Sequence, residues 1–327
     1  MKRSIKIGLS LMIIGAVLSL FGFLFGGASS TITWHDGLKV IDRKTRKEKM
    51  LQQSYTYDTV KNIEVSTALP VRIIKGDVDK VTVKATAYHE LPEVSHTQND
   101  LKVIDKQTSG ANQGKGEFRI SGFSWHYNNW DSLGGVTITL PQSQHLSDIQ
   151  ITGQNNGDVL LTDIQSDKIA IQHVADINLK NIKVTHDLTL NDIVDGHLSD
   201  VIASTATIQS DDGDLAMQNS QINNRLTIQL GDGDLSMHQN DLHSGEVHTA
   251  DGDISLLGNR LTDRLAVTTQ DGDISASIGT SSVTAKTLDG DLSAFNQHGD
   301  DQTSYTHKGK AGSYVITTDS GDVAIKR

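Results

Sequence analysis

Paired carboxylates recur along the C-terminal part of this sequence at a spacing that would suit cation binding. Asp-Gly-Asp followed by Leu or Ile occurs five times in the last 120 residues, and a sixth copy has Ser in place of the first Asp. If equivalent residues stack, their carboxylates lie about 5 Å apart and repel one another. Oxygen ligands of this kind suit calcium. The candidate ligands are the second Asp residues of the full copies: Asp214, Asp234, Asp253, Asp273 and Asp291.

The same five aspartates also have a structural interpretation. Glycine readily adopts positive φ, and a short Asp side chain hydrogen-bonds the backbone of its own turn. The calcium-binding nonapeptide repeat has a glycine pair and a nine-residue period, and this sequence has neither. We therefore expect these aspartates to form turns and expect no metal and no other cofactor, with calcium as the alternative.

The elements that position these aspartates are predicted by the spacing of the central glycines. Five of them lie 20, 19, 20 and 18 residues apart, and the sixth follows 31 residues later. A fixed period near 20 residues is typical of stacked repeats. Every second residue on both sides of each glycine is apolar or small, which predicts two short strands per repeat with alternate side chains inward. The inward positions after the glycine are Leu215 and Met217, Leu235 and Met237, Ile254 and Leu256, Ile274 and Ala276, Leu292 and Ala294, Val323 and Ile325.

The predicted fold is all-β, a single-stranded, β-helix-like β-solenoid with coils of about 20 residues. One repeat cannot bury its apolar face alone, so stacked copies share a continuous core. Weaker copies around Asp158, Asp176 and Gly196 extend the regular coils to 149–327. Residues 58–148 contain strand-like runs, irregular connections and all three prolines. We expect them to form a looser capping part of a single 58–327 domain.

The N-terminal residues predict a membrane anchor ahead of the solenoid. Ile7 to Phe25 are uncharged and mostly apolar, and a helix of that length spans about 28 Å, close to the roughly 30 Å hydrocarbon core of a bilayer. Residues 1–28 are therefore expected to form one transmembrane helix, although the small residues at 26–28 would also suit a cleaved secretory signal. The polar and basic residues 29–57 predict a juxtamembrane stalk. We expect a single-pass cell-membrane protein with its solenoid outside the cell.

Composition and motifs argue against several classes of function. The formal net charge is −11 and the sequence has no basic stripe, so nucleic acid is not an expected partner. There is no cysteine, and the 13 histidines are scattered. The sequence has no nucleophile elbow, no phosphate-binding loop and no metal-binding histidine pair. We expect no enzyme activity. The distant alternative is an enzyme active on wall polysaccharide, which would need one localised pair of carboxylates.

Aromatic residues gather in one loop ahead of the regular coils. The chain is only 5% aromatic, yet two of its three tryptophans fall between Gly116 and Gly135. Such residues would either bind a sugar or a partner protein, or cover the open end of the solenoid. The candidate binding residues are Phe118, Phe123, Trp125, Tyr127 and Trp130. Residues 296–313 predict a second excursion or cap before the last coil.

The sequence resembles a bacterial family of putative adhesins with β-strand repeats, over about residues 58–327. The resemblance rests on the recurrent Gly-Asp-Leu/Ile/Val steps, on Val136-Thr137-Ile138-Thr139-Leu140-Pro141 before the regular coils, and on the apolar segment ahead of them. It implies an all-β solenoid at the cell surface, linked in some members to the response to envelope stress. It carries over no catalytic residues.

Our leading hypothesis from the sequence is a non-enzymatic, membrane-anchored surface protein whose solenoid serves adhesion or contact with a protein or envelope component. The expected partners are the membrane, through the N-terminal helix, and an envelope polysaccharide or another membrane protein. The alternative is a regulator or scaffold in an envelope-stress response, acting through the helix and the stalk.

Overall fold

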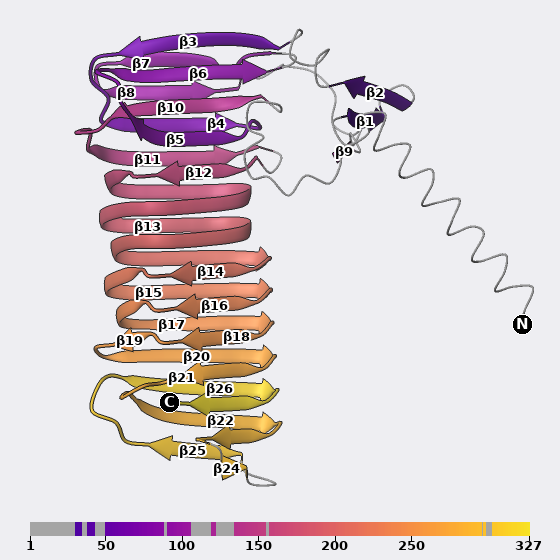
Figure 1. The fold of residues 1–327 in the computed structure, drawn as a ribbon, viewed down its shortest axis with the longest axis vertical. Coiled ribbons are helices and arrows are strands. Elements are labelled where there is room, and N and C mark those ends of the chain that lie inside the picture. The colour runs from indigo at the N-terminus through magenta and orange to yellow at the C-terminus, as the bar shows by residue number, and fades with distance from the viewer. Residues whose placement is uncertain are drawn as a thin grey trace, which may run out of the picture. The chain divides into compact units, whose positions relative to one another are not determined.

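The computed structural model describes residues 30–34, 38–42, 50–87, 90–105, 119–121, 134–154, 157–295, 297–298 and 303–327. Every regular element in these ranges is a β-strand, so the predicted all-β class is confirmed for this part of the chain. The strands belong to two compact units (Figure 1). The larger unit comprises Gln53–Ala85, Leu91–Lys106 and Gly135–Arg327.

The smaller unit contains a three-stranded sheet. Its strands are β1 (Ser30–Trp34), β2 (Leu38–Asp42) and β9 (Arg119–Ser121), in the order β2-β1-β9. Both pairings are antiparallel. The stalk expected over residues 29–57 therefore contains strands, including β3 (Leu51–Tyr57), which belongs to the other sheet. The Thr, Ile, Val, Trp and Tyr residues within these runs favour strands, although the basic composition suggested a linker.

The larger unit is a parallel β-solenoid. Its long strands pair with long strands of the neighbouring coils and its short strands with short ones, as in the register Leu215↔Leu235↔Ile254. The coil repeat expected from the glycine spacing is thus present. The regular strands are β11 (Leu146–Gly153), β12 (Val159–Thr162), β13 (Gln165–Asp212), β14 (Leu215–Gln218), β15 (Gln221–Asp232), β16 (Leu235–His238), β17 (Asp241–Asp251), β18 (Ile254–Leu257), β19 (Arg260–Leu261), β20 (Arg264–Asp271) and β21 (Ile274–Ser277).

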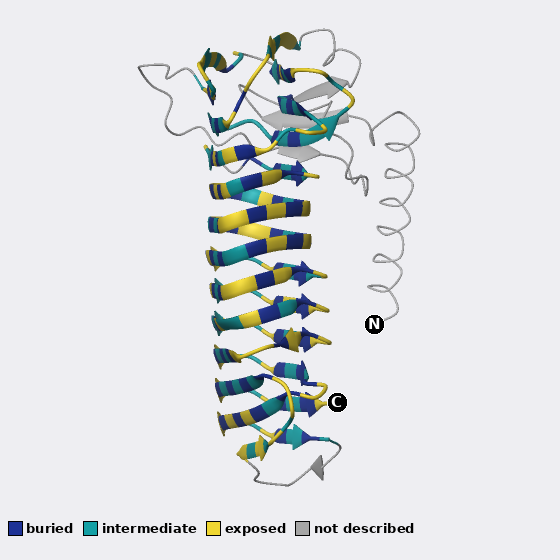
Figure 2. Ribbon diagram, turned by 90° about the vertical axis from the view of Figure 1, so that its left-hand side faces the viewer, coloured by how far each residue is buried: buried dark blue, intermediate teal, exposed yellow. Residues whose placement is uncertain are grey.

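Alternate side chains along each coil are buried, which gives the banded pattern in Figure 2. The inward residues predicted on both sides of the glycines form one continuous core, in which Ile228, Leu235 and Met237 are at most 1% exposed. Burying a side chain of this size contributes roughly 1.5–3 kcal/mol. Because each coil covers the core of its neighbours, the energy belongs to the stack and not to one repeat.

The last coil in the sequence is not the last coil in space. β26 (Ser313–Ser320) lies between β20 and β22 (Ser282–Asp289), and β27 (Val323–Lys326) lies between β21 and β23 (Leu292–Ala294). The chain leaves one layer open after β21, builds the end coil, and then returns to fill that layer (Figure 1). On the other side of β23 and β22, β24 (Gln297–His298) and β25 (Ser304–His307) pair antiparallel. The excursion expected over 296–313 therefore covers a strand edge that would otherwise be open.

The N-terminal end of the solenoid has the same kind of inversion. β4 (Asn62–Thr67) lies between β11 and β8 (Asp100–Ile104), and β5 (Val71–Gly76) lies between β12 and β10 (Gly135–Pro141). β6 (Val81–Ala87) pairs with β10 and β3, and β7 (Glu93–Thr97) pairs antiparallel with β8. The part expected to be a looser cap thus supplies parallel coil strands, and only its outermost strands depart from the coil pattern.

Candidate functional site

Close approach of successive coils requires glycine at the Asp-Gly-Asp corner. Gly213, Gly233 and Gly252 have positive φ angles of 115°, 153° and 156°. A Cβ added at Gly252 would lie closer than 3.0 Å to the Gly233 carbonyl, and one at Gly233 would meet Gly213 in the same way. The glycines therefore form a column in which each backbone rests on the next, where no side chain fits.

The second Asp of each corner binds the neighbouring coil and not its own turn. Its Oδ1 accepts a hydrogen bond from the backbone N–H of the equivalent Asp one layer on, for example Asp234 from Asp253 at 2.9 Å. The Asp253 N–H has no carbonyl partner among the described residues, whereas the flanking Gly252 and Ile254 N–H groups bond the Asp271 and Asp273 carbonyls of the next coil. The column is formed by Asp195, Asp214, Asp234, Asp253, Asp273, Asp322 and Asp291, with distances of 2.8–3.1 Å.

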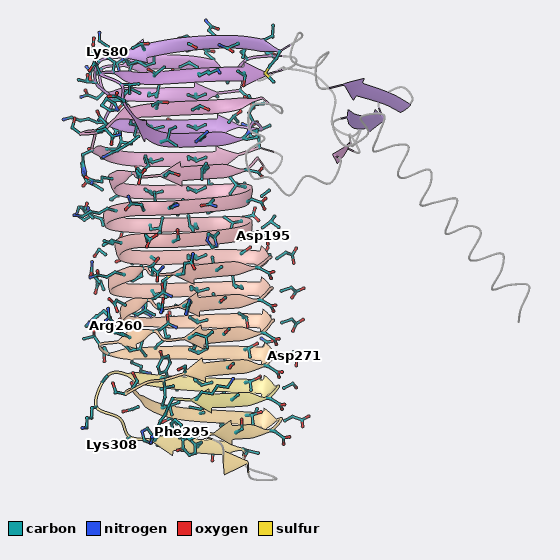
Figure 3. All side chains as sticks on the ribbon, viewed as in Figure 1. Lys80, Asp195, Arg260, Asp271, Phe295 and Lys308 are labelled. Carbon is teal, nitrogen blue, oxygen red and sulfur yellow. The ribbon has the colours of Figure 1, made fainter. Side chains whose placement is uncertain are left out.

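The first Asp of each corner forms a parallel, exposed row. Asp212, Asp232, Asp251 and Asp271 stand in register on successive coils. Figure 3 shows Asp195 and Asp271 along this edge of the solenoid and Arg260 near the opposite edge. The corner is thus a ridge of carboxylates that runs along the stack of coils.

Asp158 and Asp176 continue the line of the column toward the N-terminal coils, and their carboxyls are harder to ionise. Burial, together with the neighbouring Asp176 carboxylate, raises the pKa of Asp158 above its usual range. Burial and the charge of Asp195 likewise raise the pKa of Asp176. Partial burial is therefore the main cause of both shifts, and repulsion between neighbouring carboxylates adds to it.

The described residues contain no group of three or more His, Cys, Asp or Glu side chains arranged to hold a metal ion. In the Asp column one carboxylate oxygen is already engaged by a backbone N–H, which gives these residues a role that needs no ion. Calcium binding by Asp214, Asp234, Asp253, Asp273 and Asp291 stays a prediction.

A second corner, which the sequence analysis did not identify, turns each coil after its short strand. The turning residue has left-handed φ of 51–66° and is of no fixed type: Asp163, Asn181, Asp200, Asn219, Gln239 and Gly258. Each is followed by a buried residue. That buried residue is apolar in the earlier coils, as at Ile182 and Val201, and polar in the later ones.

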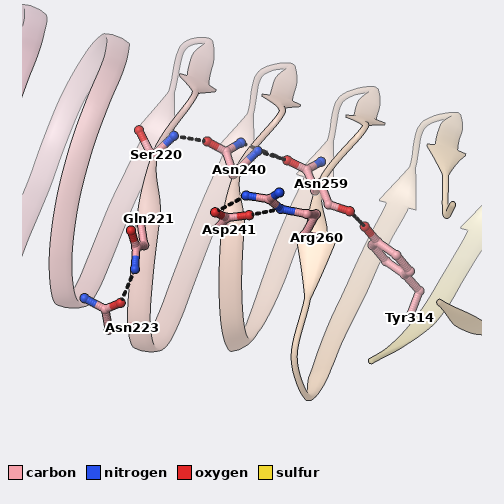
Figure 4. Close-up of polar contacts among 8 residues, drawn as sticks. All are labelled: Ser220, Gln221, Asn223, Asn240, Asp241, Asn259, Arg260 and Tyr314. Carbon is pink, nitrogen blue, oxygen red and sulfur yellow. Dashed lines mark hydrogen bonds and ion pairs between the residues drawn. The ribbon is translucent and has the colours of Figure 1, made fainter. Parts of the chain in front are cut away.

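The polar residues at this corner form a buried ladder (Figure 4). Asn240 Oδ1 accepts from the Ser220 N–H at 2.9 Å, and Asn259 Oδ1 accepts from the Asn240 N–H at 3.0 Å. The Asn240 amide also donates to the Met217 carbonyl and to Asn259 Oδ1, both at 2.9 Å. Asn240 is fully buried. Every polar atom of its side chain is therefore hydrogen-bonded, as burial of an amide requires.

Tyr314 completes this ladder from the inserted coil. Its side chain is fully buried, and its hydroxyl donates to the Asn259 carbonyl at 3.3 Å. Burial raises the pKa of Tyr314 to about 12, so the phenol stays protonated and remains a donor across the physiological range.

Two of the sequence-predicted features lie outside the described residues. The aromatic set Phe118, Phe123, Trp125, Tyr127 and Trp130 is one, and the predicted transmembrane helix over 1–28 is the other. Within the ranges that the structure describes, no helix has the length and apolarity to cross a membrane. The described residues therefore offer the exposed Asp corner and the lateral faces of the coils as candidate binding surfaces.

Parallel coils of about 20 residues, an inward apolar column and hydrogen-bonded polar corners define the class of this protein as an all-β solenoid. The family model described as Toastrack DUF4097 matches residues 60–326. The chain belongs to this family, which agrees with the resemblance to putative adhesins inferred from the repeated steps.

Several crystal structures are similar to this chain. One is a putative adhesin from Bacteroides fragilis, at 12% identity and TM-score 0.41, covering 85% of this chain and 97% of that one. A putative lipid binding protein from Parabacteroides distasonis matches at 12% identity and TM-score 0.47, covering 84% and 96%. A putative adhesin from the same species matches at 12% identity and TM-score 0.43, covering 84% and 97%. No curated protein matches the chain.

Proposed function

We propose that this chain is a membrane-anchored surface protein without catalytic activity, whose solenoid binds envelope components or another protein. The observation that carries the proposal is the long lateral surface of outward polar side chains held in strict register. One such row consists of Gln209, Gln229, His248 and Thr268 on four successive coils. A rigid, repetitive surface of this kind is how solenoids present extended binding faces. Family membership supports the same proposal.

The absence of catalysis is supported by how the carboxylates are used. They are repeated at every coil, and the Oδ1 atoms of the Asp column accept backbone hydrogen bonds. A glycoside hydrolase needs one localised pair of carboxyls with different roles. The repeated corner serves the coil stack equally at every layer, which favours a structural role over a reaction centre.

Localisation and binding are tested together with the full-length protein carrying a C-terminal epitope tag. Lys326 and Arg327 are exposed, so a tag attached there is accessible. We expect an antibody to label the tag on intact cells, and the purified protein to sediment with cell-wall or membrane fractions. An antibody signal only after permeabilisation would contradict the proposed location, and no sedimentation with any fraction would contradict the binding role.

The alternative function, a regulator or scaffold in an envelope-stress response, predicts a different result for a chain lacking residues 1–28. A binding protein keeps its affinity for wall or membrane fractions without the anchor. A regulator acting through the helix loses its signalling and shows no intrinsic binding. Comparing stress-reporter output with sedimentation of the same variant separates the two.

A further inference from the structure

Each coil has a third corner, which lies shortly after the second one along the chain. The coils differ in length at this third corner, and the difference creates a groove. Between the buried residues Ile222 and Leu226 the chain has three residues, and between Leu242 and Gly245 of the next coil it has two. The following coil again has three, between Leu261 and Leu265. The middle coil is therefore recessed between two longer corners.

The recess is a groove of about 420 Å³. Its rim is polar and is contributed by all three coils: Gln221, Asn223, Asp241, His243, Arg260 and Thr262. Its floor is formed by the chain at Ile222, Leu242 and Leu261, which are themselves at most 5% exposed. The volume falls within the roughly 300–1,000 Å³ that is usual for small-ligand sites.

Some polar side chains on the rim pair with one another, and others have no protein partner among the described residues. Arg260 forms a two-pronged ion pair with Asp241, and Gln221 Nε2 donates to Asn223 Oδ1 at 2.7 Å (Figure 4). Within the described coils the His243 ring and the Thr262 hydroxyl have no protein hydrogen-bond partner. The rim therefore presents hydrogen-bond donors and acceptors side by side, which suits a ligand that has both kinds of group.

We propose that this groove binds a neutral saccharide with adjacent free hydroxyl groups. Such a ligand presents paired donors and acceptors, which match the paired atoms of an amide, a carboxylate and a guanidinium. The inference rests on the proposed function in one respect, since it names the chemical class of the envelope component that is bound.

Charge and backbone pairing argue against other ligands. The Arg260 charge is already matched by Asp241, so no cation is left over for a phosphate or carboxylate. An extended peptide would need unpaired main-chain groups. The Asp241 and Arg260 N–H groups instead bond the Ser220 and Asn240 carbonyls at 2.8 Å.

The test uses full-length protein in a detergent without a sugar headgroup. Maltohexaose, cellohexaose, mannotriose and triacetylchitotriose are titrated in turn, with trigalacturonate as the anionic contrast, and binding is followed by calorimetry and saturation-transfer NMR. We expect at least one neutral oligosaccharide to bind with a Kd of about 0.1–1 mM. Arg260→Ala and Asp241→Ala should each weaken that binding at least about tenfold.

Arg225→Ala is the matched control. It breaks a similar exposed ion pair, to Glu246 at 2.8 Å, on the same coils but outside the groove. We expect it to leave the Kd within about twofold of the wild type. Thermal melting of all three variants checks that the fold is retained. No binding of any neutral probe at about 10 mM, preference for trigalacturonate, or equal loss in the Arg225 and Arg260 variants would overturn the proposal.

Wall sedimentation of the same variants distinguishes failure of the groove from failure of the proposed function. If the wild type and Arg260→Ala sediment equally and no saccharide binds, the groove proposal fails while envelope binding stands. If a neutral saccharide binds through Arg260 but nothing sediments, the groove stands and the proposed function fails.

Discussion

The Asp-Gly-Asp corner and the buried Asn corner use the same hydrogen bond in opposite settings. In both, a side-chain Oδ1 accepts the backbone N–H of the equivalent residue in a neighbouring coil, because the turn directs that N–H away from the carbonyl ladder. The Asp column is exposed and negatively charged, whereas the Asn ladder is buried and neutral. The donors also run in opposite directions, since Asp234 donates to the preceding coil and Asn240 donates to the following one.

This difference shows that the environment determines which side chain caps a coil. A carboxylate is a stronger acceptor than an amide and is tolerated where water solvates its second oxygen. In the core an unpaired charge would be heavily penalised, and there the amide supplies the donor that bonds the Met217 carbonyl as well. The two corners also differ in their backbone, because only the Asp corner needs glycine.

The largest expected effect comes from placing a side chain in the glycine column. Gly252→Ala puts a Cβ closer than 3.0 Å to the Gly233 carbonyl at a φ of 156°, and we expect a loss of about 4 kcal/mol in the free energy of unfolding. Chemical denaturation of the full-length protein measures it. The control at the other corner is Gly258→Ala, where the nearest atom to the new Cβ is Gln239 Cγ at 3.6 Å. Equal losses in the two variants would mean that the corners do not differ in backbone requirement.

The next largest effect is expected from exchanging the capping side chains of the two corners. Asn240→Asp places a carboxylate in a fully buried position and removes the amide donor to Met217, so we expect a loss of about 3 kcal/mol at pH 7. Asp253→Asn keeps an oxygen acceptor for the Asp273 N–H and removes one charge from the column, and we expect a change within about 0.5 kcal/mol. Thermal and denaturant unfolding of both variants measure the contrast. A loss of similar size in the two would show that charge is not what separates the corners.

The coil and its inward residues were predictable from the sequence because each coil repeats the same residue types around a glycine. The second corner was not, because its turning position is filled by Asp, Asn, Gln or Gly and the buried position after it by Ile, Val, Ser or Asn. The left-handed conformation is tolerated by several residue types, so it leaves no repeated letter.

The inverted order of the end coils was also missed. Ser320-Gly321-Asp322 has the same local pattern as the other corners, and insertion of β26 between β20 and β22, instead of beyond β22, depends on tertiary contacts that periodicity does not encode. The 31-residue interval before Gly321 was the available signal. The groove similarly depends on one extra residue per corner, which becomes visible only when the coils are aligned by their pairing.

A smaller effect is expected at Asp158, in the partly buried start of the Asp column. Because the pKa of Asp158 is raised in the folded state, mainly by burial, its ionisation destabilises the fold as pH rises above the unfolded value of 3.8. Asp158→Asn should therefore stabilise the protein at pH 7, and the gain should vanish below about pH 3. Denaturant unfolding measured from about pH 3 to about pH 7 tests this dependence.

Asp167 is the control of opposite sign for that pH dependence. Hydrogen bonds from Thr185 and His145 lower the pKa of Asp167, so its stabilising contribution is present above the unfolded value and is lost as pH falls through the folded one. Asp167→Asn should accordingly destabilise the protein at pH 7. A pH-independent effect for either variant would show that ionisation is not the cause.

The smallest expected effect is that of calcium on the exposed carboxylate ridge. One oxygen of each aspartate in the column accepts a backbone N–H, so relief of repulsion should require only screening by salt. We expect millimolar calcium chloride to raise the Tm no more than sodium chloride at the same ionic strength. A specific site would stabilise the folded protein by mass action and shift the Tm further with each increase in calcium. Such a shift, abolished by Asp253→Asn, would replace the purely structural account of the Asp column with a calcium site, and the buried Asn ladder would remain unaffected.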